Sequence, residues 1–313
     1  MILVTGGTGF VGSRLLKRLV KDGFETRASL RSQVSNLPGG IQSILIDGMT
    51  ASTDWSLALK GVQEVVHCAS RVHVMQDDAA ETLQIFRQVN VDGTLNLATQ
   101  AAQAGVRRFV FVSSIKVNGE ATQLGHPFTA YDVAAPLDPY GLSKLEAELG
   151  LREIEAQSSM EVVIVRPPLV YGPGVKANFA SMMRWVASGI PLPLGSVYNS
   201  RSLVAVDNLV DFLVTCLRHH AAAGHTFLVS DGEDISTTEL LRRTAKAMDK
   251  FYFLLPVPVS MLEFGAALLG KREVAQRLLS SLQVDIKKTR CLLAWSPPLT
   301  LDEGLKKAVE GMK

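Results

Sequence analysis

The sequence predicts an α/β protein whose first half forms a doubly wound parallel sheet and whose second half adds a smaller lobe. Three observations support this fold class. Short β-branched and apolar runs alternate with amphipathic segments through the first half of the chain. A glycine-rich turn joins the first run to the first amphipathic segment. Proline pairs then divide the second half into short pieces, which is typical of an irregular lobe.

The first half contains six apolar runs of strand length, separated by segments with helical spacing. The expected strands are Ile2–Val4, Thr26–Leu30, Ile44–Ile46, Glu64–His67, Phe109–Ser113 and Val162–Val165. The expected helices are Phe10–Lys21, Asp54–Leu59, Ala79–Ala104 and Tyr140–Ala156. In the first helix, Val11, Leu15 and Leu19 recur on one face. Because strands and helices alternate, the sheet is expected to be parallel.

The second half changes character after residue 170. Pro191-Leu192-Pro193, Pro256-Val257-Pro258 and Pro297-Pro298 interrupt short helical patterns. We expect a dinucleotide-binding domain from residues 1–170 together with about 202–230. Residues 171–201 together with about 231–313 would form the substrate-binding lobe.

The composition is consistent with a soluble globular protein and excludes several other classes. The chain has 313 residues, 47% hydrophobic content and a net charge of +2, which offers no electrostatic case for nucleic acid or an anionic membrane. The three cysteines, Cys68, Cys216 and Cys291, are widely spaced, so we expect neither a disulfide framework nor a metal site. With the first strand beginning at Ile2, no signal peptide is expected, and we predict a cytoplasmic protein.

One strongly apolar stretch, Phe251 to Gly270, resembles a membrane span in composition. It is interrupted by Pro256, Pro258 and Glu263, whereas a spanning helix needs about 20 predominantly apolar residues. We therefore expect a strand or loop followed by a buried helix, without stable membrane insertion.

The turn from Gly6 to Gly12 has the pattern of a nucleotide-binding turn in a Rossmann sheet. Gly6 permits the tight turn out of the strand, Gly9 lets a pyrophosphate approach the backbone, and Gly12 allows close helix packing. Phe10 and Val11 open the helix whose unpaired N–H groups would face the phosphates. A lone glycine triplet is weak evidence, but this one follows a strand and opens an amphipathic helix.

The end of the second strand bears on the choice of cofactor. An acidic residue there would bind the ribose 2′-hydroxyl of NAD, but the segment reads Arg27-Ala-Ser-Leu-Arg31-Ser. Arg31 could bind a 2′-phosphate, which favours NADP(H) while leaving NAD(H) open; a plain surface arginine is the alternative. Asp47-Gly48 lies where an adenine contact would fall, or forms a simple turn.

Tyr140 and Lys144 are one helical turn apart and therefore point in the same direction. A nearby ammonium favours the phenolate, so we expect Lys144 to lower the pKa of Tyr140. Ser114, at the carboxyl end of the fifth strand, is the expected hydrogen-bonding serine, with Ser113 as the competing choice. This trio is suited to proton transfer beside a hydride step at a carbon bearing oxygen.

The chain resembles the extended short-chain dehydrogenase/reductases over essentially its whole length. The matching segments, in order, are Thr5-Gly-Gly-Thr-Gly-Phe-Val-Gly12, His67-Cys-Ala-Ser70, Val89-Asn-Val-Asp-Gly-Thr94, Phe111-Val-Ser-Ser114, Tyr140-x-x-x-Lys144, Arg166-Pro-x-x-x-Tyr171-Gly-Pro173 and Leu293-Ala-Trp295-Ser-Pro297. The resemblance implies Ser114, Tyr140 and Lys144 as the catalytic set. It also implies Ala69, Ser70 and Pro167 beside the cofactor.

The second lobe is similar to that of nucleotide-sugar 4-epimerases and 4-keto reductases. This resemblance implies that Asn178 contacts the nucleotide and that Arg201 binds the diphosphate, with Arg277 as a weaker candidate. A structural pair between Arg201 and Asp207 is the alternative. Lys116 would face the pocket or be a solvated lysine. A homodimer through the Ala79–Ala104 and Tyr140–Ala156 helices is also implied.

Two departures from the epimerase pattern guide the functional expectation. The acid after the second strand is absent, and Val117-Asn118-Gly119 replaces the usual Val-Tyr-Gly. We therefore expect an NADPH-dependent reductase of a UDP-linked 4-keto-6-deoxy-N-acetylhexosamine, serving O-antigen or capsule synthesis. The alternatives are a UDP-sugar 4-epimerase with bound NAD, a hydroxysteroid or flavonoid-type ketone reductase, and a non-catalytic dinucleotide-binding regulator.

Overall fold

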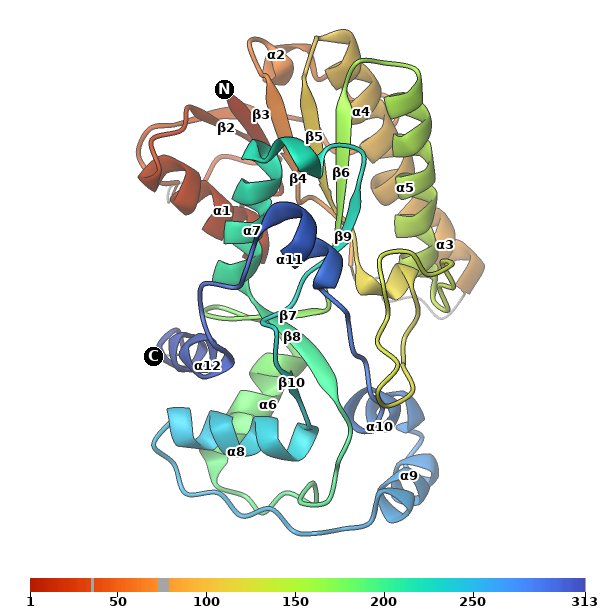
Figure 1. Cartoon of the computed structure of the whole chain (residues 1–313), viewed down its shortest axis with the longest axis vertical. Helices are drawn as coiled ribbons and strands as arrows, with labels where there is room; N and C mark the ends of the chain where they lie inside the picture. Colours follow the sequence, from red (N-terminus) through yellow and green to blue (C-terminus); the bar gives the residue numbers. More distant parts are fainter. Residues whose placement is uncertain (35–36, 73–78, 313) are drawn as a thin grey trace.

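The computed structural model describes residues 1–34, 37–72 and 79–312. Among these residues, seven strands form a parallel sheet in the order β3-β2-β1-β4-β5-β6-β9, flanked by helices, and the predicted fold class is confirmed. Figure 1 shows this sheet in the upper part of the molecule and a smaller lobe below it. The strands are β1 (Ile2–Thr5), β2 (Thr26–Leu30), β3 (Ile41–Leu45), β4 (Glu64–His67), β5 (Arg108–Val112), β6 (Glu161–Arg166) and β9 (Thr226–Leu228).

Helices cover both faces of the sheet and bury two separate apolar clusters. On one face, α1 (Phe10–Lys21) and α7 (Val206–Arg218) pack side chains such as Leu16 and Phe212 against the strands. On the other face, α2 (Ser56–Leu59), α4 (Gly93–Gln103) and α5 (Pro139–Ala156) pack side chains such as Leu97 and Leu151. The central strands β1 and β4 are buried throughout, as expected for a sheet covered on both faces, whereas the edge strand β3 is largely exposed.

The strand order reverses beside β1, which pairs with β2 on one side and β4 on the other. Ligands of open α/β sheets bind at such a switch point, outside the carboxyl ends of the strands. Gly6 follows β1 at this edge, Ser113 follows β5, and Pro167 follows β6.

The expected helix from residues 79 to 104 is present with a local change in winding. It consists of α3 (Ala79–Phe86), a π-helical segment η1 (Arg87–Asp92) and α4. A Cβ on Gly93 would meet the Met49 carbonyl oxygen at 2.7 Å, so glycine allows this helix to lie close to the segment after β3. A π-helical segment in the middle of a helix often marks a functional site.

The smaller lobe is built around a second sheet and its own apolar cluster. The strands β7 (Leu169–Tyr171), β8 (Arg201–Ala205) and β10 (Asp234–Ile235) pair in the order β10-β8-β7. Three helices, α6 (Ala177–Ser188), α8 (Thr237–Ala247) and α12 (Leu301–Glu310), contribute side chains to the cluster around Phe179. The remaining elements are η2 (Ile115–Val117), η3 (His220–Ala222), α9 (Val259–Leu268), α10 (Arg272–Leu279) and α11 (Lys287–Leu293).

The expectation of a buried helix within Phe251–Gly270 is wrong. This stretch forms a loop followed by α9, and α9 buries none of its residues. Phe251, Phe264 and Leu268 are 85%, 68% and 73% exposed. The expectation assumed that the chain covers a strongly apolar helix on all sides, whereas α9 packs against the rest of the lobe only in part, through side chains such as Val259 and Leu262. Among the described residues, no helix is both long and apolar enough to cross a membrane.

Candidate active site

The turn from β1 into α1 has the shape needed for a dinucleotide. Gly6 has φ +68°, and a Cβ there would lie 2.7 Å from the Ala69 nitrogen. A Cβ on Gly12 would collide with the Gly6 carbonyl, and the Gly9 N–H donates to that same carbonyl at 2.8 Å. Helix α1 starts after Gly9 with no side-chain cap, so its first N–H groups face outward unpaired. These residues therefore fit a pyrophosphate group.

Helix α5 carries Tyr140 and Lys144 from a well-defined N-terminus. Asp138 is the N-cap and accepts from the Gly141 N–H at 2.6 Å, and Pro139 occupies the first turn. Tyr140 is half-buried, while Lys144 is buried below it. Lys144 Nζ donates to the Val112 carbonyl at 2.9 Å and lies 4.3 Å from the Phe111 ring centroid. The helix thus aims its lysine at the carboxyl end of β5.

The pKa of Tyr140 is not lowered as expected. Burial raises it to about 12, a hydrogen bond with Ser70 opposes the rise, and the charge on Asp138 adds to it. Burial also lowers the pKa of Lys144 to about 7, although Glu148 and Cys68 favour its charged form. Because Lys144 is directed to the Val112 carbonyl, desolvation of Tyr140 outweighs any attraction between the phenolate and this amine.

The structure separates the roles of the two candidate serines. The Ser113 hydroxyl is buried and donates to Glu148, which also forms an ion pair with Arg166 beneath α5. Ser114 is half-buried, and its Oγ accepts from the Lys116 N–H at 3.2 Å. The Ser113 hydroxyl is therefore used in a buried hydrogen bond, and Ser114 is the serine whose hydroxyl can still donate to a ligand.

Asn90 was not assigned a role from sequence, yet it links several parts of the site. It lies in the π-helical segment η1 and is buried. Its Oδ1 accepts from Ser70 Oγ at 3.1 Å and from the Arg71 N–H at 2.8 Å. Its Nδ2 donates to Ser143 Oγ at 3.1 Å. Asn90 therefore links the loop after β4 to α5. In the sequence, the Val89-Asn90-Val91 segment was the signal that could have identified this residue.

A second buried residue without an assigned role, His67, ties the first and fourth strands together. Its Nδ1 lies 2.7 Å from Thr5 Oγ1, and its Nε2 lies 2.9 Å from Thr94 Oγ1. Burial lowers the pKa of His67 to about 3, and the charge on Lys144 adds to this effect. The imidazole is therefore neutral, and it holds the glycine turn in register with the strand beside it.

The other residues expected at the cofactor lie along the same edge of the sheet. Ala69 follows β4 and donates its N–H to Thr5 Oγ1 at 3.2 Å. Pro167 follows β6, and its carbonyl accepts from the Ile115 N–H at 3.0 Å. Arg31 follows β2 and is exposed, with no hydrogen bond or ion pair to another residue in the described part of the chain. Asp47 is exposed after β3, and the neighbouring Gly48 carbonyl accepts from Thr53 Oγ1.

Lys116 is held by two acids. Its Nζ forms ion pairs with Asp138 and, at 3.2 Å, with Glu120. Because Asp138 is the N-cap of α5, this pair joins the loop after β5 to the helix that carries Tyr140. Lys116 therefore lies close to the candidate site and has a structural role there.

In the smaller lobe, Arg201 is bound to the end of α10. Its Nη1 donates to the Arg277 carbonyl at 2.7 Å and the Ser280 carbonyl at 3.0 Å. The alternative pairing with Asp207 is wrong, because Asp207 pairs with Lys307 at 2.8 Å. The Arg277 side chain is exposed. The side chain of Asn178, near the start of α6, lies outside what the structure describes.

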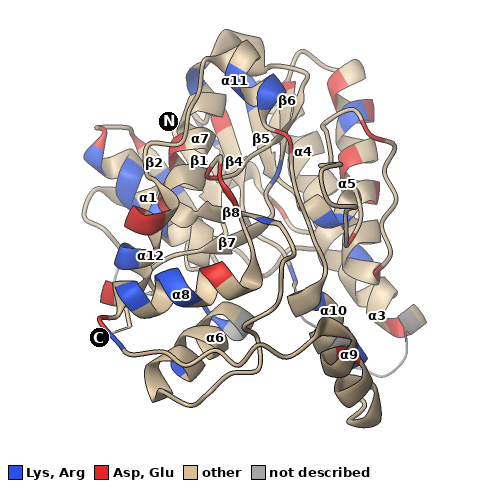
Figure 2. Ribbon diagram, turned by 60° about the horizontal axis from the view of Figure 1, so that its bottom comes forward, with Lys and Arg blue, Asp and Glu red and all other residues tan. Residues whose placement is uncertain are grey.

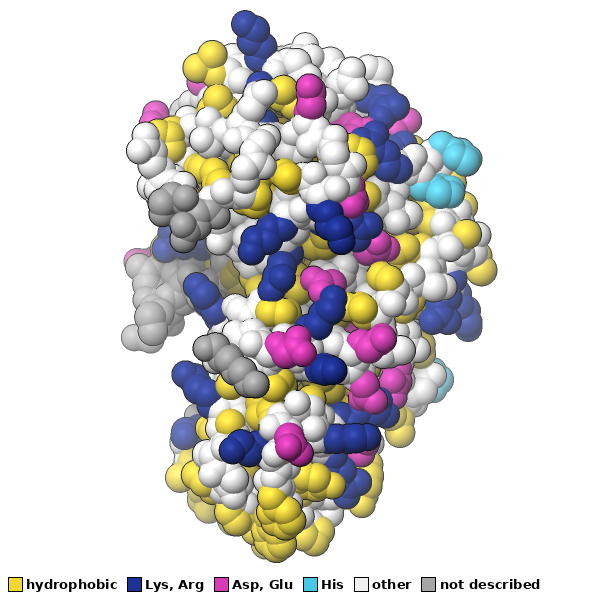
Figure 3. Space-filling model, turned by 90° about the vertical axis from the view of Figure 1, so that its left-hand side faces the viewer, with side chains coloured by type: hydrophobic (Ala, Val, Ile, Leu, Met, Phe, Trp, Pro, Cys, Tyr) yellow, Lys and Arg dark blue, Asp and Glu magenta, His cyan; other side chains and the backbone are white. Residues whose placement is uncertain are grey.

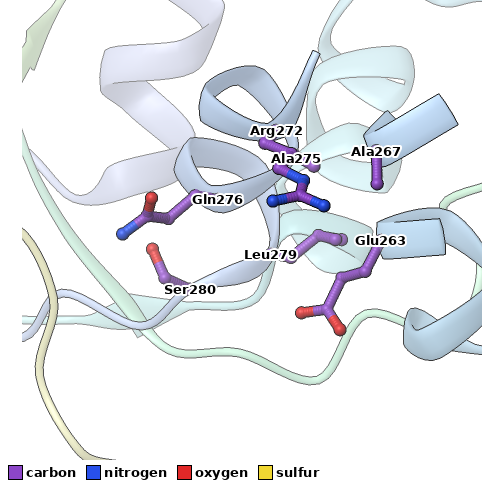
Figure 4. Close-up of a pocket in the computed structure, with 7 residues that line it drawn as sticks. All are labelled: Glu263, Ala267, Arg272, Ala275, Gln276, Leu279 and Ser280. Atoms are coloured by element: carbon purple, nitrogen blue, oxygen red, sulfur yellow. The ribbon is translucent and has the colours of Figure 1, made fainter. Parts of the chain in front are cut away.

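A hollow of about 410 Å³ lies between α9 and α10 (Figure 4). Its lining residues are Glu263, Ala267, Arg272, Ala275, Gln276, Leu279 and Ser280. None of them belongs to the glycine turn or to α5. Within the described residues, no group of His, Cys, Asp and Glu side chains could hold a metal ion. All three cysteines are free thiols.

Comparisons with known proteins agree with this arrangement. A family model described as the NAD dependent epimerase/dehydratase family matches residues 2–230. The chain is 52% identical over 311 residues to the UDP-glucose 4-epimerase of Vibrio cholerae, covering 99% of this chain and 94% of that one. It is 26% identical over 326 residues to the N-acetyl-alpha-D-glucosaminyl-diphospho-ditrans,octacis-undecaprenol 4-epimerase of Escherichia coli O157:H7, again covering 99% and 94%.

Two solved structures show the same fold. The UDP-glucuronic acid 4-epimerase from Bacillus cereus in complex with NAD has a TM-score of 0.77 and 21% identity, covering 99% of this chain and 98% of that one. The UDP-glucose 4-epimerase of Thermotoga maritima with UDP-glucose has a TM-score of 0.75 and 22% identity, with the same coverage.

Proposed function

Because the chain belongs to the NAD dependent epimerase/dehydratase family, we propose that it is a UDP-sugar 4-epimerase that retains NAD. It is an enzyme of the extended short-chain dehydrogenase/reductase type. The observation that carries the proposal is 52% identity to the Vibrio cholerae UDP-glucose 4-epimerase over 99% of the chain. This match favours the epimerase over the 4-keto reductase that the departures in the sequence suggested.

The proposed chemistry assigns a role to each residue of the trio. Bound NAD would accept a hydride from the sugar and return it. Tyr140 Oη would take the proton of the sugar 4-hydroxyl and later give it back, while Ser114 Oγ hydrogen-bonds the same sugar oxygen. Lys144 would stabilise the phenolate. Since burial raises the Tyr140 pKa, this step requires the Lys144 ammonium to turn from the Val112 carbonyl towards Tyr140.

Arg201 is our candidate for binding the substrate diphosphate. Its hydrogen bonds to the Arg277 and Ser280 carbonyls both use Nη1, which leaves Nε and Nη2 to donate to phosphate oxygens. Its anchoring to α10 would limit the freedom that the side chain loses on binding. In the same lobe, Asn178 remains a proposed contact to the nucleotide, and Arg277 remains a weaker second candidate for the diphosphate.

For the cofactor, we propose NAD in place of the NADP(H) that Arg31 suggested. The UDP-glucuronic acid 4-epimerase from Bacillus cereus was solved with NAD. Arg31 is exposed and bound to no described residue, so it could accept either cofactor without structural cost. Asp47 and Gly48 remain proposed adenine contacts.

A 4-keto reductase is the second candidate, and one observation still favours it. No acid follows β2, and Arg31 stands there instead. The other departure no longer supports the reductase, because Asn118 has a structural explanation. Its Oδ1 accepts from Arg166 Nη1 at 2.9 Å, and its Nδ2 donates to the Thr129 carbonyl at 3.0 Å.

The two functions differ in net cofactor consumption. We expect the purified protein to interconvert UDP-glucose and UDP-galactose, or their N-acetylated forms, without added cofactor and to release NAD on denaturation. A reductase would instead oxidise one NADPH for each UDP-linked 4-keto sugar. Stoichiometric NADPH oxidation with no epimerisation of any 4-hydroxyl sugar would reject the epimerase.

The assembly and cellular role also remain proposals. We propose a cytoplasmic homodimer through α3, η1, α4 and α5, and a role in surface-polysaccharide precursor synthesis. Leu149 on α5 is 57% exposed, as expected for a helix that packs against a second copy. The Escherichia coli O157:H7 relative, named for a diphospho-undecaprenol-linked sugar, supports the biosynthetic assignment.

A further inference from the structure

The end of the smaller lobe farthest from the parallel sheet carries exposed apolar side chains. We call this surface the apolar tip and define it by Phe251, Tyr252, Phe253, Met261, Phe264 and Leu268. In Figure 1 the chain between α8 and α9 runs along the lower end of the molecule. Figure 3 shows hydrophobic side chains gathered at that same end. Large apolar patches of this kind mark interaction surfaces.

The loop part of the tip is exposed on more than one side. Phe251, Tyr252 and Phe253 are 85%, 43% and 52% exposed. The loop is extended where Leu254 pairs with Leu192. Successive side chains of an extended chain point to opposite sides, so a flat protein face could cover only some of these three rings. A medium that surrounds the loop could cover all of them.

Helix α9 is apolar on more than one face: Val259 and Leu262 pack partly against the lobe's apolar cluster, and a second apolar face is turned to solvent. Met261, Phe264 and Leu268 follow the i, i+3, i+7 pattern of one helix face and are 63%, 68% and 73% exposed. A helix on the surface of a water-soluble protein normally turns such a face inward. At 10 residues, α9 is about 15 Å long and too short to cross a bilayer.

Basic side chains lie at both ends of the tip, where they could contact lipid phosphates. Lys250 precedes the loop, and Lys271 and Arg272 follow α9; all three are exposed. Between them, Glu263 is the single charged residue, and the acidic residues Asp249 and Glu273 lie just outside in the sequence. Figure 2 shows this loop and α9 almost free of charged residues. The net charge of +2 would not steer the whole molecule to a membrane, so the attraction must be local.

We propose that the apolar tip docks the enzyme on the surface of a bilayer that contains anionic lipids. The three rings of the loop and the exposed face of α9 enter the interface between headgroups and acyl chains. Lys250, Lys271 and Arg272 remain at the level of the lipid phosphates. The enzyme lies on the membrane without spanning it, with the active-site edge of the sheet held in water.

Vesicle flotation tests this docking. The probes are phosphatidylcholine vesicles with and without phosphatidylglycerol, with the full-length wild-type protein. We expect the protein to float with the anionic vesicles and to be released in part by salt. The Phe251→Glu/Phe264→Glu variant should lose about tenfold or more in partitioning, because two phenylalanine rings would no longer be buried in the interface. Lys250→Glu/Lys271→Glu should lose binding to anionic vesicles only.

Leu57→Glu is the matched control. Leu57 is also an exposed apolar residue, 71% exposed, but it lies on α2 beside the parallel sheet. This variant should float like wild type. All variants should keep their NAD content and their turnover of soluble UDP-sugar, so the test is independent of the proposed function.

Three results would overturn the proposal. The first is failure of the wild type to bind anionic vesicles. The second is equal flotation of wild type and the Phe251→Glu/Phe264→Glu variant. The third is a change in oligomeric state of that variant in analytical ultracentrifugation, which would mean that a second copy of the chain covers the tip.

Discussion

Replacing Lys144 by methionine should stabilise the cofactor-free protein while abolishing its activity. Lys144 is buried, and burial lowers its pKa from the ordinary value of 10.5 to about 7. The unfolded chain therefore binds a proton that the folded chain partly gives up at neutral pH. Methionine keeps the unbranched apolar stem and has no charge to desolvate.

The size of the effect follows from the two pKa values. One pKa unit corresponds to about 1.36 kcal/mol, so at pH 7 burial of this amine costs about 4 kcal/mol of folding free energy. Stability rises with pH wherever the unfolded state binds more protons, here between about pH 7 and pH 10.5. Near pH 10 the penalty falls to about 1 kcal/mol. Loss of the hydrogen bond to the Val112 carbonyl offsets about 1 kcal/mol of the gain.

Urea unfolding of both proteins at a series of pH values provides the assay. NAD must be removed first and its absence checked by absorbance, since a bound ligand adds its own stabilisation. We expect the Lys144→Met variant to be more stable by roughly 3 kcal/mol at pH 7, with the advantage shrinking towards pH 10. A difference that does not change between these pH values would refute the reasoning, and so would a less stable variant at pH 7.

Four further predictions concern single residues. Tyr140→Phe should lower turnover about 10²–10⁴-fold with NAD binding retained; activity within threefold of wild type would remove Tyr140 from the mechanism. Arg31→Asp should leave NAD binding to the cofactor-free protein nearly unchanged in calorimetric titrations, because NAD has no 2′-phosphate for Arg31 to bind, and tight NADPH binding by the wild type that the variant loses would favour the reductase instead. Arg201→Ala should raise KM for a UDP-sugar about 10–150-fold with a smaller change in kcat, because the lost contact is worth about 1.5–3 kcal/mol. An unchanged KM would mean that Arg201 has only a structural role, through its hydrogen bonds to α10. The wild type should lose about 2 kcal/mol of unfolding free energy between pH 7 and pH 5, because the unfolded imidazole takes up a proton near pH 6.5 while the folded one stays neutral until about pH 3. His67→Asn should remove this loss. An equal loss in both proteins would mean that another group causes the pH dependence.

The sequence by itself determined the features that depend on local spacing. Alternating apolar runs established the parallel sheet, because strand and helix periods are properties of neighbouring residues. The Gly6–Gly12 turn could be predicted from its glycines, because the tight turn has no room for a Cβ at positions 6 and 12. The four-residue spacing of Tyr140 and Lys144 similarly placed both on one face of α5.

Only the tertiary structure decided how side chains distant in sequence meet. It assigned Ser113 to Glu148 and left Ser114 free for a ligand. It brought Asn90 against Ser70 and showed that burial, more than the neighbouring lysine, controls the pKa of Tyr140. It also left one apolar face of α9 exposed to solvent. Partners and desolvation depend on which segments pack together, and local periodicity carries no information about that packing.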